Sequence, residues 1–408
     1  MHDAGDLSPV TQPESSAARG EIRVKLFART DVGQIREHNE DNFLVADLTR
    51  CARGLLEANR SVAVGPHGSL LAVCDGMGGA AAGEIASQLA VDILYERMIE
   101  GLESMPTLSR DELARRLVRA IESAGLRIFH DAKVDRTRRG MGTTVTAAAL
   151  VDGCLFFAQV GDSRGYVLRD GELVQLTRDQ SLVNQLIEAG QLTEEEAETF
   201  EHNNIILQAL GTADTVQVDL TYCELQRGDV LLLCSDGLSG MVRFDEIREV
   251  MRSAPEPVDA CKLLIERANQ AGGHDNITVI VAAFDGDGLA APSPDAEPLK
   301  YRKYVLPEEP LDTEPNRRLL AEMAVPRSPS SFGPSSGLQG MGSTVLFSSQ
   351  PPSGSTSLAP PRMRSSRPGG YEEERIEIPG THVPPWVVVA LVAGVIAVLL
   401  GTAFLFLR

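Results

Sequence analysis

The sequence LLAVCDGMGG, at residues 70–79, joins an apolar run to Asp75 and then to three glycines interrupted only by Met77. A strand that needed only a tight turn could end at Asn-Gly or Asp-Gly. Here a carboxylate is followed by backbone with almost no side-chain cover, so a charged group can come close to the main chain. Taken alone, the stretch is equally compatible with an ordinary turn that leads into a helix.

The composition narrows the possible functions. The chain of 408 residues carries 38 basic and 57 acidic side chains, a formal charge of −19. This balance argues against a nucleic-acid partner, whose phosphates need a basic surface. Carboxylates are also the ligands that hard divalent cations require, so part of the acidic excess is compatible with a metal site. The 6 cysteines contain no CxxC pair and are expected to be reduced, mostly buried thiols of a cytosolic domain.

Composition also divides the chain into segments. Residues 1–20 are polar and lack the apolar core of a signal peptide, so we expect a disordered N-terminus. Residues 21–285 alternate strand-like and helix-like stretches with few prolines, as expected of one packed domain. Residues 286–385 are rich in Pro, Ser and Gly and predict a disordered linker.

Residues 386–407, WVVVALVAGVIAVLLGTAFLFL, form an uncharged apolar run. As a helix this run would reach roughly 33 Å, enough to span a bilayer, and we expect a transmembrane helix. A buried core helix is the alternative, but such a helix has no reason to be apolar on all sides after a disordered linker. Because only Arg408 follows, the expected topology is a single-pass tail anchor in the cell inner membrane, with the domain in the cytoplasm.

The predicted domain is rich in strands. Runs of β-branched and aromatic residues predict strands at residues 22–30, 42–47, 70–75, 143–151, 154–160, 166–170, 216–225, 229–236 and 277–284. Apolar residues at three- and four-residue steps predict helices at residues 81–102 and 109–134. Strands separated by a helical pair favour an α+β fold in which helices cover antiparallel sheets.

Several predicted strands begin or end at a carboxylate. Glu40 and Asp41 precede one strand. Asp75 and Asp236 end two others, and Asp275 stands just before the last. A single aspartate in such a place is usually a solvated turn residue. If the strand ends converge, however, the carboxylates would repel each other and raise each other's pKa unless a cation lies among them. Oxygen ligands without a Cys or His cluster favour Mg²⁺ or Mn²⁺ over zinc.

Such a site would suit chemistry at phosphorus. Two ions about 4 Å apart would bridge a water, lower its pKa and neutralise the oxygens of an in-line displacement. Arg36 precedes Glu40 by four residues, and its guanidinium is then a natural fork for the equatorial oxygens of a phosphate. From spacing alone, an ordinary surface arginine is an equally good interpretation.

The motifs of the domain resemble those of one family. The segments TDVGQIREHNEDNF, AVCDGMGG, GMGTT, VGDSRGYVLRDGELVQLTRDQS, ILQALG, CSDGL and HDNITVIV occur in the order seen in the bacterial type 2C, metal-dependent protein serine/threonine phosphatases. The resemblance covers about residues 24–284. It implies a central antiparallel β-sandwich flanked by helical pairs, a four-layer αββα arrangement, with a binuclear Mn²⁺ or Mg²⁺ centre at one edge. It also implies hydrolysis of phosphoserine and phosphothreonine in proteins by metal-bound hydroxide, without a phosphoenzyme.

The resemblance implies roles for individual residues. Asp75 resembles the carboxylate that bridges both metals, and the carbonyl of Gly76 resembles a ligand of one of them. Asp236 and Asp275 match ligands of the other metal, and Arg36 matches the phosphate-binding arginine.

Further positions are assigned on the same basis. Glu40 and Asp41 match acidic residues that bind the metals directly or through waters. Asn276 is expected to orient Asp275 or its loop from the second coordination shell. Asp162 and Arg164 lie in a motif that is mostly structural, and we expect them to form an internal ion pair.

Three positions depart from the family pattern. Met77 stands where animal relatives carry a histidine proposed as general acid, so the proton for the leaving oxygen must come from elsewhere. Arg139 stands where many bacterial members have an aspartate that helps to hold a third metal, which argues against a conventional third site; Asp135 is the nearby carboxylate. Asn203 stands where a proline is common, within residues 181–211, which correspond to the flap beside the active site.

Other functions stay open at this point. A pseudophosphatase would bind phosphoproteins without turnover, and a regulator of sigma factors would act on anti-sigma antagonists. The glycine-rich DGMGGAAAG is compatible with nucleotide binding, although no Lys-Ser/Thr follows it as in a P-loop. The complete ligand set argues against a pseudophosphatase, and the N-terminal R-x-x-x-E-D pattern and the flap favour a phosphatase that opposes bacterial serine/threonine kinases. Tethering to the membrane would favour membrane kinases and their substrates as partners.

Overall fold

The computed structural model describes residues 20–54, 61–78, 82–197, 200, 204–293 and 297–307, which all belong to one compact unit of the chain, Met1–Val325. The predicted membrane helix at residues 386–407, the linker beyond residue 307 and the N-terminal segment before Gly20 lie outside the described residues. Among the helices that the structure describes, none is both long and apolar enough to cross a membrane.

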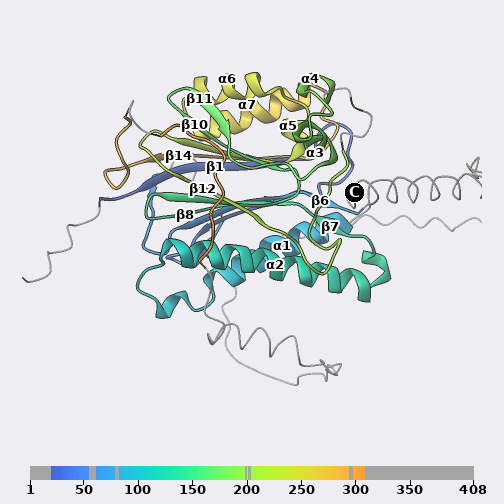
Figure 1. Ribbon diagram of the computed structural model, residues 1–408, viewed down its shortest axis with the longest axis horizontal. Helices are drawn as coiled ribbons and strands as arrows, with labels where there is room; N and C mark the ends of the chain where they lie inside the picture. The colour runs from blue at the N-terminus through green and yellow to red at the C-terminus, as the bar shows by residue number, and fades with distance from the viewer. Residues whose placement is uncertain are drawn as a thin grey trace, which may run out of the picture. The chain divides into compact units, whose positions relative to one another are not determined.

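Two antiparallel sheets, which we call sheet A and sheet B, form the centre of the domain (Figure 1). In spatial order, sheet A consists of β11 (Glu172–Gln175), β10 (Arg164–Arg169), β13 (Val230–Cys234), β14 (Ile277–Asp285), β1 (Arg23–Asp31) and β4 (Ser61–Ala63). Sheet B consists of β12 (Asp219–Glu224), β9 (Cys154–Val160), β8 (Val145–Val151), β5 (Ser69–Cys74), β2 (Asn42–Asp47) and β3 (Ala52–Arg53). A separate ladder pairs β6 (Gly76–Met77) with β7 (Gly142–Thr143).

Helices cover the outer faces of both sheets (Figure 1). The long helices α1 (Ala82–Ile99) and α2 (Arg110–Val134) lie on sheet B, and α6 (Phe244–Ser253) and α7 (Pro257–Gln270) lie on sheet A. Three apolar cores therefore separate four layers: one beneath α1 and α2, one between the sheets, and one beneath α6 and α7. This arrangement confirms the predicted α+β sandwich flanked by helical pairs.

Side-chain alternation along the strands builds this layering. In β5, Leu70 and Ala72 enter the core beneath the helices, whereas Leu71 and Val73 enter the core between the sheets. Successive residues of a strand point to opposite faces, so a strand buried on both faces must be apolar throughout. This explains why LLAVC is continuous rather than alternating.

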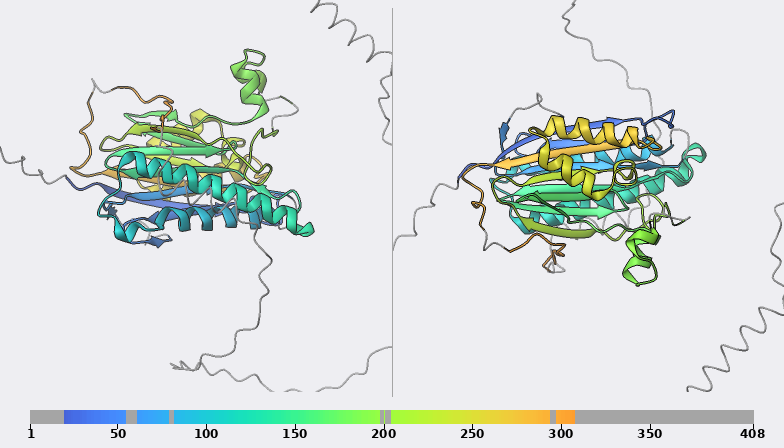
Figure 2. Two further views of the ribbon diagram at one scale, coloured as in Figure 1. Left: turned by 60° about the horizontal axis from the view of Figure 1, so that its bottom comes forward. Right: turned by 90° about the horizontal axis from the view of Figure 1, so that it is seen from above.

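Shorter helices lie between these main elements along the chain. The structure contains α3 (Leu182–Glu188), α4 (Glu194–Ala197) and α5 (Asp236–Ser239), and the short 3₁₀ turns η1 (Leu102–Ser104) and η2 (Arg136–Arg138). Helix α2 begins after Ser109, whose hydroxyl accepts a hydrogen bond from the amide of Glu112 at 3.3 Å, as expected of an N-cap serine. In both views of Figure 2, the segment that carries α3 and α4 stands out from the body of the sandwich.

The folded part of the chain continues beyond the predicted boundary at residue 285. Strand β14 ends at Asp285, but residues 286–293 and 297–307 follow as described structure, and Leu299 and Tyr304 pack on the apolar cores. The beginning of the predicted linker therefore belongs to the folded domain. All 6 cysteines are unpaired, and all but Cys51 are buried, which agrees with the prediction of reduced, mostly buried thiols.

Candidate metal and phosphate site

The predicted carboxylates meet at one edge of the sandwich. Strand pairing produces this convergence, because Asn42 lies opposite Cys74 at the start of β2 and the end of β5. In sheet A, the end of β13 lies beside the start of β14, with Cys234 opposite Val279. The residues just outside these strand ends are the predicted ligands. Figure 1 shows α5 and the β6–β7 ladder at this same end of the domain.

Asp41 joins the two sheets at this edge. Its Oδ2 accepts hydrogen bonds from the hydroxyls of Ser235 at 2.8 Å and Thr278 at 2.7 Å, and the residue is only 4% exposed. Burial is the main reason why the pKa of Asp41 rises to about 7, although the two hydroxyls oppose this rise. Its second oxygen, Oδ1, has no hydrogen-bond partner in the described part of the chain.

Asp75 and Asp236 lie within hydrogen-bonding reach of each other. Loss of hydration, followed by the nearby charges of Asp41 and Asp236, raises the pKa of Asp75 well above its usual range. Desolvation also raises the pKa of Asp236, while the hydrogen bond from Asp75 lowers it. Two half-buried carboxyls this close together repel each other as anions, so a cation between them would relieve strong repulsion.

The backbone around Asp75 is held firmly. Its amide donates to the hydroxyl of Thr144 at 3.0 Å, and its carbonyl accepts from the hydroxyl of Thr143 at 2.9 Å. The carbonyl also accepts from the amide of Thr144 at 2.8 Å. The threonines of GMGTT therefore fix the carboxylate that follows β5.

Glu40 lies against two glycines. A Cβ on Gly83 would come within 2.1 Å of Glu40 Oε2, and a Cβ on Gly76 would come within 2.5 Å of the Glu40 carbonyl oxygen. These glycines are needed for close approach, which supplies a physical reason for the glycine after Asp75. Partial burial raises the pKa of Glu40, and the charge of Arg36 opposes that rise.

Arg36 and Asp275 form an ion pair at the rim of the site. Arg36 Nη2 donates to Asp275 Oδ2 at 2.7 Å, and the arginine side chain keeps 52% of its surface exposed. This bond is the largest cause of the raised pKa of Arg36. The remaining guanidinium N–H groups can therefore meet an anion that enters from solvent.

Asn276 organises the loop between β1 and β2. Its side-chain amide donates to the carbonyls of Val32 at 3.0 Å and His38 at 2.9 Å, and its oxygen accepts from the amide of Glu40 at 2.8 Å. The backbone amide of Asn276 donates to Asp275 Oδ1 at 2.8 Å. Asn276 thus orients both Asp275 and the loop that carries Arg36 and Glu40.

The predicted ion pair between Asp162 and Arg164 is wrong. Arg164 binds Asp179 instead, with its Nη2 at 2.7 Å and its Nε at 2.8 Å from Asp179 Oδ2. Asp162 is buried close to the other carboxylates, and its pKa rises to about 7, mainly through desolvation and then through the charge of Asp236. In an extended strand, residues i and i+2 point to the same face. Asp162 lies outside β10, which begins at Arg164, so the two side chains do not share a face.

Arg139 is one of the positions that depart from the family pattern and lie within the described residues. Arg139 is exposed, just after η2, and the next residues run beside Gly78, whose Cβ would meet Met141 Cα at 2.9 Å. Asp135 accepts from the amide of Thr137 at 2.9 Å and caps η2. Asn203 lies outside the described residues.

The donor set fits hard cations. Oδ1 atoms of Asp41, Asp162 and Asp236 are buried without hydrogen-bond partners among the described residues. Buried carboxylate oxygens without partners are costly unless a cation or water binds them. In the part of the chain that the structure describes, no three Asp, Glu, His or Cys side chains already surround one point as ligands.

Sequence reasoning missed the hydroxyl residues that hold the carboxylates. Ser235 and Thr278 bind Asp41, and Thr143 and Thr144 bind Asp75. All four stand inside or next to the quoted motifs CSDGL, HDNITVIV and GMGTT. Their places inside these motifs were the available signal.

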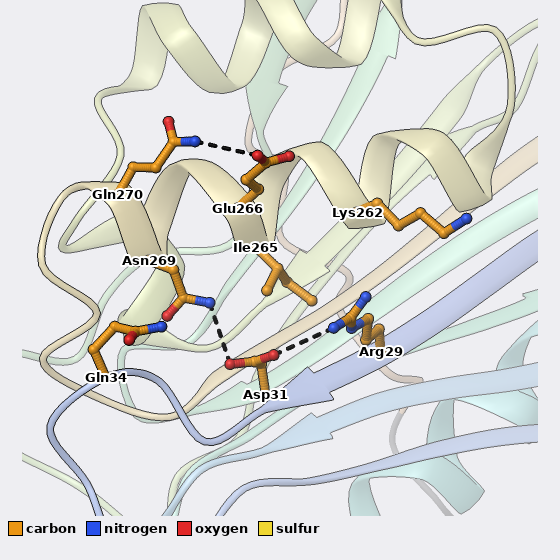
Figure 3. A pocket seen from close by; sticks show the side chains of 8 residues that line it. All are labelled: Arg29, Asp31, Gln34, Lys262, Ile265, Glu266, Asn269 and Gln270. Carbon is orange, nitrogen blue, oxygen red and sulfur yellow. Dashed lines mark hydrogen bonds and ion pairs between the residues drawn. The ribbon is translucent and has the colours of Figure 1, made fainter.

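A separate cavity of about 580 Å³ lies between β1 and α7 (Figure 3). There, Asp31 accepts hydrogen bonds from Asn269 at 3.2 Å, Gly33 at 3.1 Å and Arg29 at 3.4 Å. These bonds fix the end of β1, just before the loop that carries Arg36. The residues that line the cavity thus support that loop. The cavity itself does not include the clustered carboxylates.

Comparison with known proteins agrees with this geometry. Residues 58–290 match the family described as protein phosphatase 2C. The serine/threonine phosphatase Stp of Listeria monocytogenes is 38% identical over 257 residues, which cover 63% of this chain and 94% of the relative. A serine/threonine phosphatase of S. agalactiae has a TM-score of 0.56 at 36% identity, covering 64% of this chain and 99% of that structure.

A further solved structure bears on the metals. The catalytic domain of the serine/threonine phosphatase PstP, in complex with 2 manganese ions, has a TM-score of 0.53 at 36% identity and covers 65% of this chain and 99% of its own. The family match spans more than half of this chain, and the Listeria relative is covered almost completely. The chain therefore belongs to the protein phosphatase 2C family and is a serine/threonine protein phosphatase.

Proposed function

We propose that the carboxylate site holds two divalent cations, Mn²⁺ or Mg²⁺, and hydrolyses phosphoserine and phosphothreonine in proteins. The observation that carries this proposal is the cluster of buried carboxylates with unpartnered oxygens, beside a half-exposed arginine. A binding module that only recognised phosphate would need the arginine but would gain nothing from burying mutually repelling acids. The manganese ions of the PstP catalytic domain support the same interpretation.

The ligand assignment carries over the family resemblance, residue by residue. We assign Asp75 as the ligand shared by both cations, with the carbonyl of Gly76 as a ligand of one. Asp236 and Asp275 are assigned to the other cation. Asp75 is favoured for the shared role because it interacts with both Asp41 and Asp236.

Two acidic residues are placed more loosely. We assign Glu40 and Asp41 to the cations directly or through waters. Asp41 already uses one oxygen to accept from Ser235 and Thr278, so only Oδ1 is available. Asn276 and Asp162 belong to the surrounding shell, where Asn276 holds the loop and Asp162 adds negative charge.

The cations, when bound, would acidify a water and neutralise the phosphoryl oxygens. The chain's own residues do the rest. Arg36 binds the equatorial phosphoryl oxygens with the guanidinium N–H groups that Asp275 leaves free. Water oxygen forms the new bond to phosphorus while the bond to the Ser or Thr oxygen breaks, and that oxygen takes up a proton. Met77 has no proton to give, so the residue after Gly76 is not the acid.

The direct test is phosphate release from a phosphothreonine peptide with Mn²⁺, Mg²⁺ or chelator. Asp75→Asn and Asp236→Asn keep the size of each side chain but remove the charge. We expect turnover that requires metal and that falls by at least about a hundredfold in both variants. Equal turnover in chelator, or full activity of both variants, would contradict the two-cation proposal. A folded chain that binds Mn²⁺ without turnover would favour a phosphoprotein-binding role.

We further propose that the domain acts at a membrane. Support comes from the uncharged apolar run at residues 386–407, which lies outside the described residues and is long enough to span a bilayer. The Pro-, Ser- and Gly-rich residues 308–385 would let the domain range tens of ångströms from the anchor. Membrane serine/threonine kinases and their substrates are then the favoured targets, because tethering raises the local concentration of the enzyme.

A further inference from the structure

Residues 297–307, which we call the strap, follow the matched family region and dock on the edge of sheet B. The amide of Tyr222 donates to the carbonyl of Arg302 at 3.2 Å, and the amide of Tyr304 donates to the carbonyl of Leu220 at 2.8 Å. The strap thus adds a short antiparallel bridge beside β12. The Tyr304 ring packs edge-on against Phe156 and Tyr222, with ring centroids 4.9 Å and 5.2 Å apart.

Tyr301 of the strap is held at both its hydroxyl and its ring. The hydroxyl donates to the carboxylate of Asp219, with oxygen–oxygen distances of 2.8 Å and 3.0 Å. The guanidinium carbon of Arg178 lies 4.3 Å from the centroid of the ring, a cation–π contact. Arg178 stands outside the strap, on the segment that joins β11 to α3, so this contact links the strap to that segment.

Arg178 also binds the end of α3. Its Nε lies 3.1 Å from Glu188 Oε1, and Glu188 is the last residue of this helix. The same carboxylate oxygen accepts from Asn184 Nδ2 at 3.1 Å, one turn earlier in the helix. A continuous set of contacts therefore runs from Tyr301 through Arg178 to Glu188.

The segment that carries α3 starts and ends beside the carboxylate site. At its start, the side chain of Gln180 accepts from the amide of Gly161 at 2.9 Å, next to Asp162. At its end, the amide of Leu210 donates to the carbonyl of Thr143 at 2.9 Å, and Thr143 binds Asp75. Helix α3 stands out from the sandwich between these two attachments, as Figure 2 shows.

We infer that the strap positions α3 beside the site through the Tyr301–Arg178–Glu188 contacts, and so sets how the site admits a polypeptide substrate. The inference rests on the proposed function. Tyr301 and Arg178 are positioning residues, because within the described structure their side-chain partners are Asp219, Glu188 and each other rather than the clustered carboxylates. The two ends of the segment that carries α3 lie beside the carboxylates, so a phosphopeptide that extends from the site reaches the segment, whereas a small aryl phosphate needs only the carboxylates and Arg36. Loss of the contacts should therefore affect the peptide selectively.

The test uses the full-length chain with Tyr301→Leu, Arg178→Gln and both together. With Mn²⁺ present, we expect each single change to raise KM for a phosphothreonine peptide by about threefold to tenfold, the range of one lost cation–π contact or ion pair. Kinetics with p-nitrophenyl phosphate should not change. Amide hydrogen exchange in α3 should become faster in each variant. The double variant should be no worse than the more severe single variant, because both changes break one set of contacts.

Two further variants keep the test decisive. Tyr304→Phe removes only a hydroxyl that donates to Asp111 on α2, so it should match the unaltered chain in every readout. Tyr301→Phe keeps the ring over Arg178 and loses only the hydroxyl bond to Asp219, so it should change the peptide KM less than Tyr301→Leu does. If Tyr301→Leu does not fold, Arg178→Gln tests the same set of contacts. Unchanged peptide KM and unchanged α3 exchange in the Tyr301 and Arg178 variants would overturn the inference, as would additive effects. Failure of the unaltered chain to hydrolyse the aryl phosphate would overturn the proposed function instead, and α3 exchange would still decide the inference.

Discussion

Individual carboxylates at this site are shielded from water, and some of their oxygens have no hydrogen-bond partner among the described residues. Asp41 uses one oxygen for two hydroxyls and leaves the other without a partner among the described residues. Asp75 loses hydration and lies beside the charges of Asp41 and Asp236, so its pKa rises well above the usual range. Each arrangement is unfavourable for an anion alone and favourable for an anion beside a cation. Arg36, by contrast, remains half exposed and ready for a phosphate.

Arg36→Ala should raise KM for a phosphothreonine peptide by roughly tenfold or more, because a charge-assisted contact to the phosphoryl oxygens is lost. Steady-state kinetics with Mn²⁺ measure this change. Arg97→Ala is the matched control, since Arg97 lies in the last turn of α1 and pairs with Glu100 at 3.1 Å. Equal KM values for the Arg36 and Arg97 variants would count against the phosphate-binding role.

The raised pKa values also predict how pH affects stability after removal of metal by chelator. Asp41 and Asp162 have folded pKa values of about 7, against an ordinary value of 3.8. The folded chain therefore holds more protons than the unfolded chain between these limits, and the free energy of unfolding falls as pH rises through that window. We expect the Tm in chelator to be higher near pH 5.5 than near pH 8.

Two comparisons check this pH dependence. Asp162→Asn should reduce the fall in Tm between the two pH values, since one of the responsible carboxyls is gone. Mn²⁺ should raise Tm more at pH 8 than at pH 5.5, because protons compete with the cation at low pH. A Tm in chelator that rises with pH across this window would contradict the role of the buried carboxylates.

At the scale of elements, the sequence predicts the interior well and the contacts between loops poorly. The strands β2 and β9 have the predicted limits because buried strands need continuous apolar runs. The short edge strands β4 and β11 carry too few such residues to be recognised. The partner of Arg164 could not be predicted from spacing, because Asp179 arrives through the hairpin of β10 and β11. Convergence of the carboxylates was predicted from their places at strand ends, whereas the hydroxyls that bind them were not.

The two glycine contacts around Glu40 supply an element-scale prediction. In Gly76→Ala, the new Cβ would lie 2.3 Å from the carbonyl oxygen of Gly83 and 2.5 Å from that of Glu40. Backbone atoms on both sides cannot move away easily, so we expect a loss of roughly 1–3 kcal/mol in the free energy of unfolding. Urea denaturation measures it.

Gly125→Ala is the control for this change. Gly125 lies within α2, where a Cβ would come closest to the end of the Leu210 side chain, at 3.2 Å, and would make ordinary contacts of 3.7 Å with Val216. Alanine is also the better helix former, which offsets a small adjustment of that side chain. Similar losses in the two variants would show that the tight approach at Gly76 has no special importance.

At the scale of the whole molecule, the four-layer domain places its acids at one edge and extends past the family region into the strap. The strap packs on β12 and α2. The described part of the chain therefore ends beside these two elements and not at the end of β14. The linker and the apolar run at residues 386–407 then follow along the sequence. Catalysis and tethering are thus assigned to separate parts of the chain.

Deletion of residues 386–408 tests that separation. Peptide turnover by the purified enzyme should be unchanged, because every assigned ligand lies within residues 36–276. Dephosphorylation of a membrane-bound serine/threonine kinase in cells should decrease, because the tether no longer raises the local concentration. Phosphorylation of the kinase, measured at matched enzyme abundance, reports this effect. Equal dephosphorylation by the two forms would contradict the anchoring proposal.

The most direct measurement is the number of Mn²⁺ ions bound per chain, determined by calorimetric titration, with phosphopeptide turnover followed in the same titration. We expect two ions per chain and turnover that requires both. Asp75→Asn should lose binding of at least one ion together with turnover, since this carboxylate is assigned to both cations. Turnover with no bound ion would contradict a site in which two cations are needed for hydrolysis. An Asp75→Asn variant that still binds two ions and hydrolyses the peptide normally would contradict it as well.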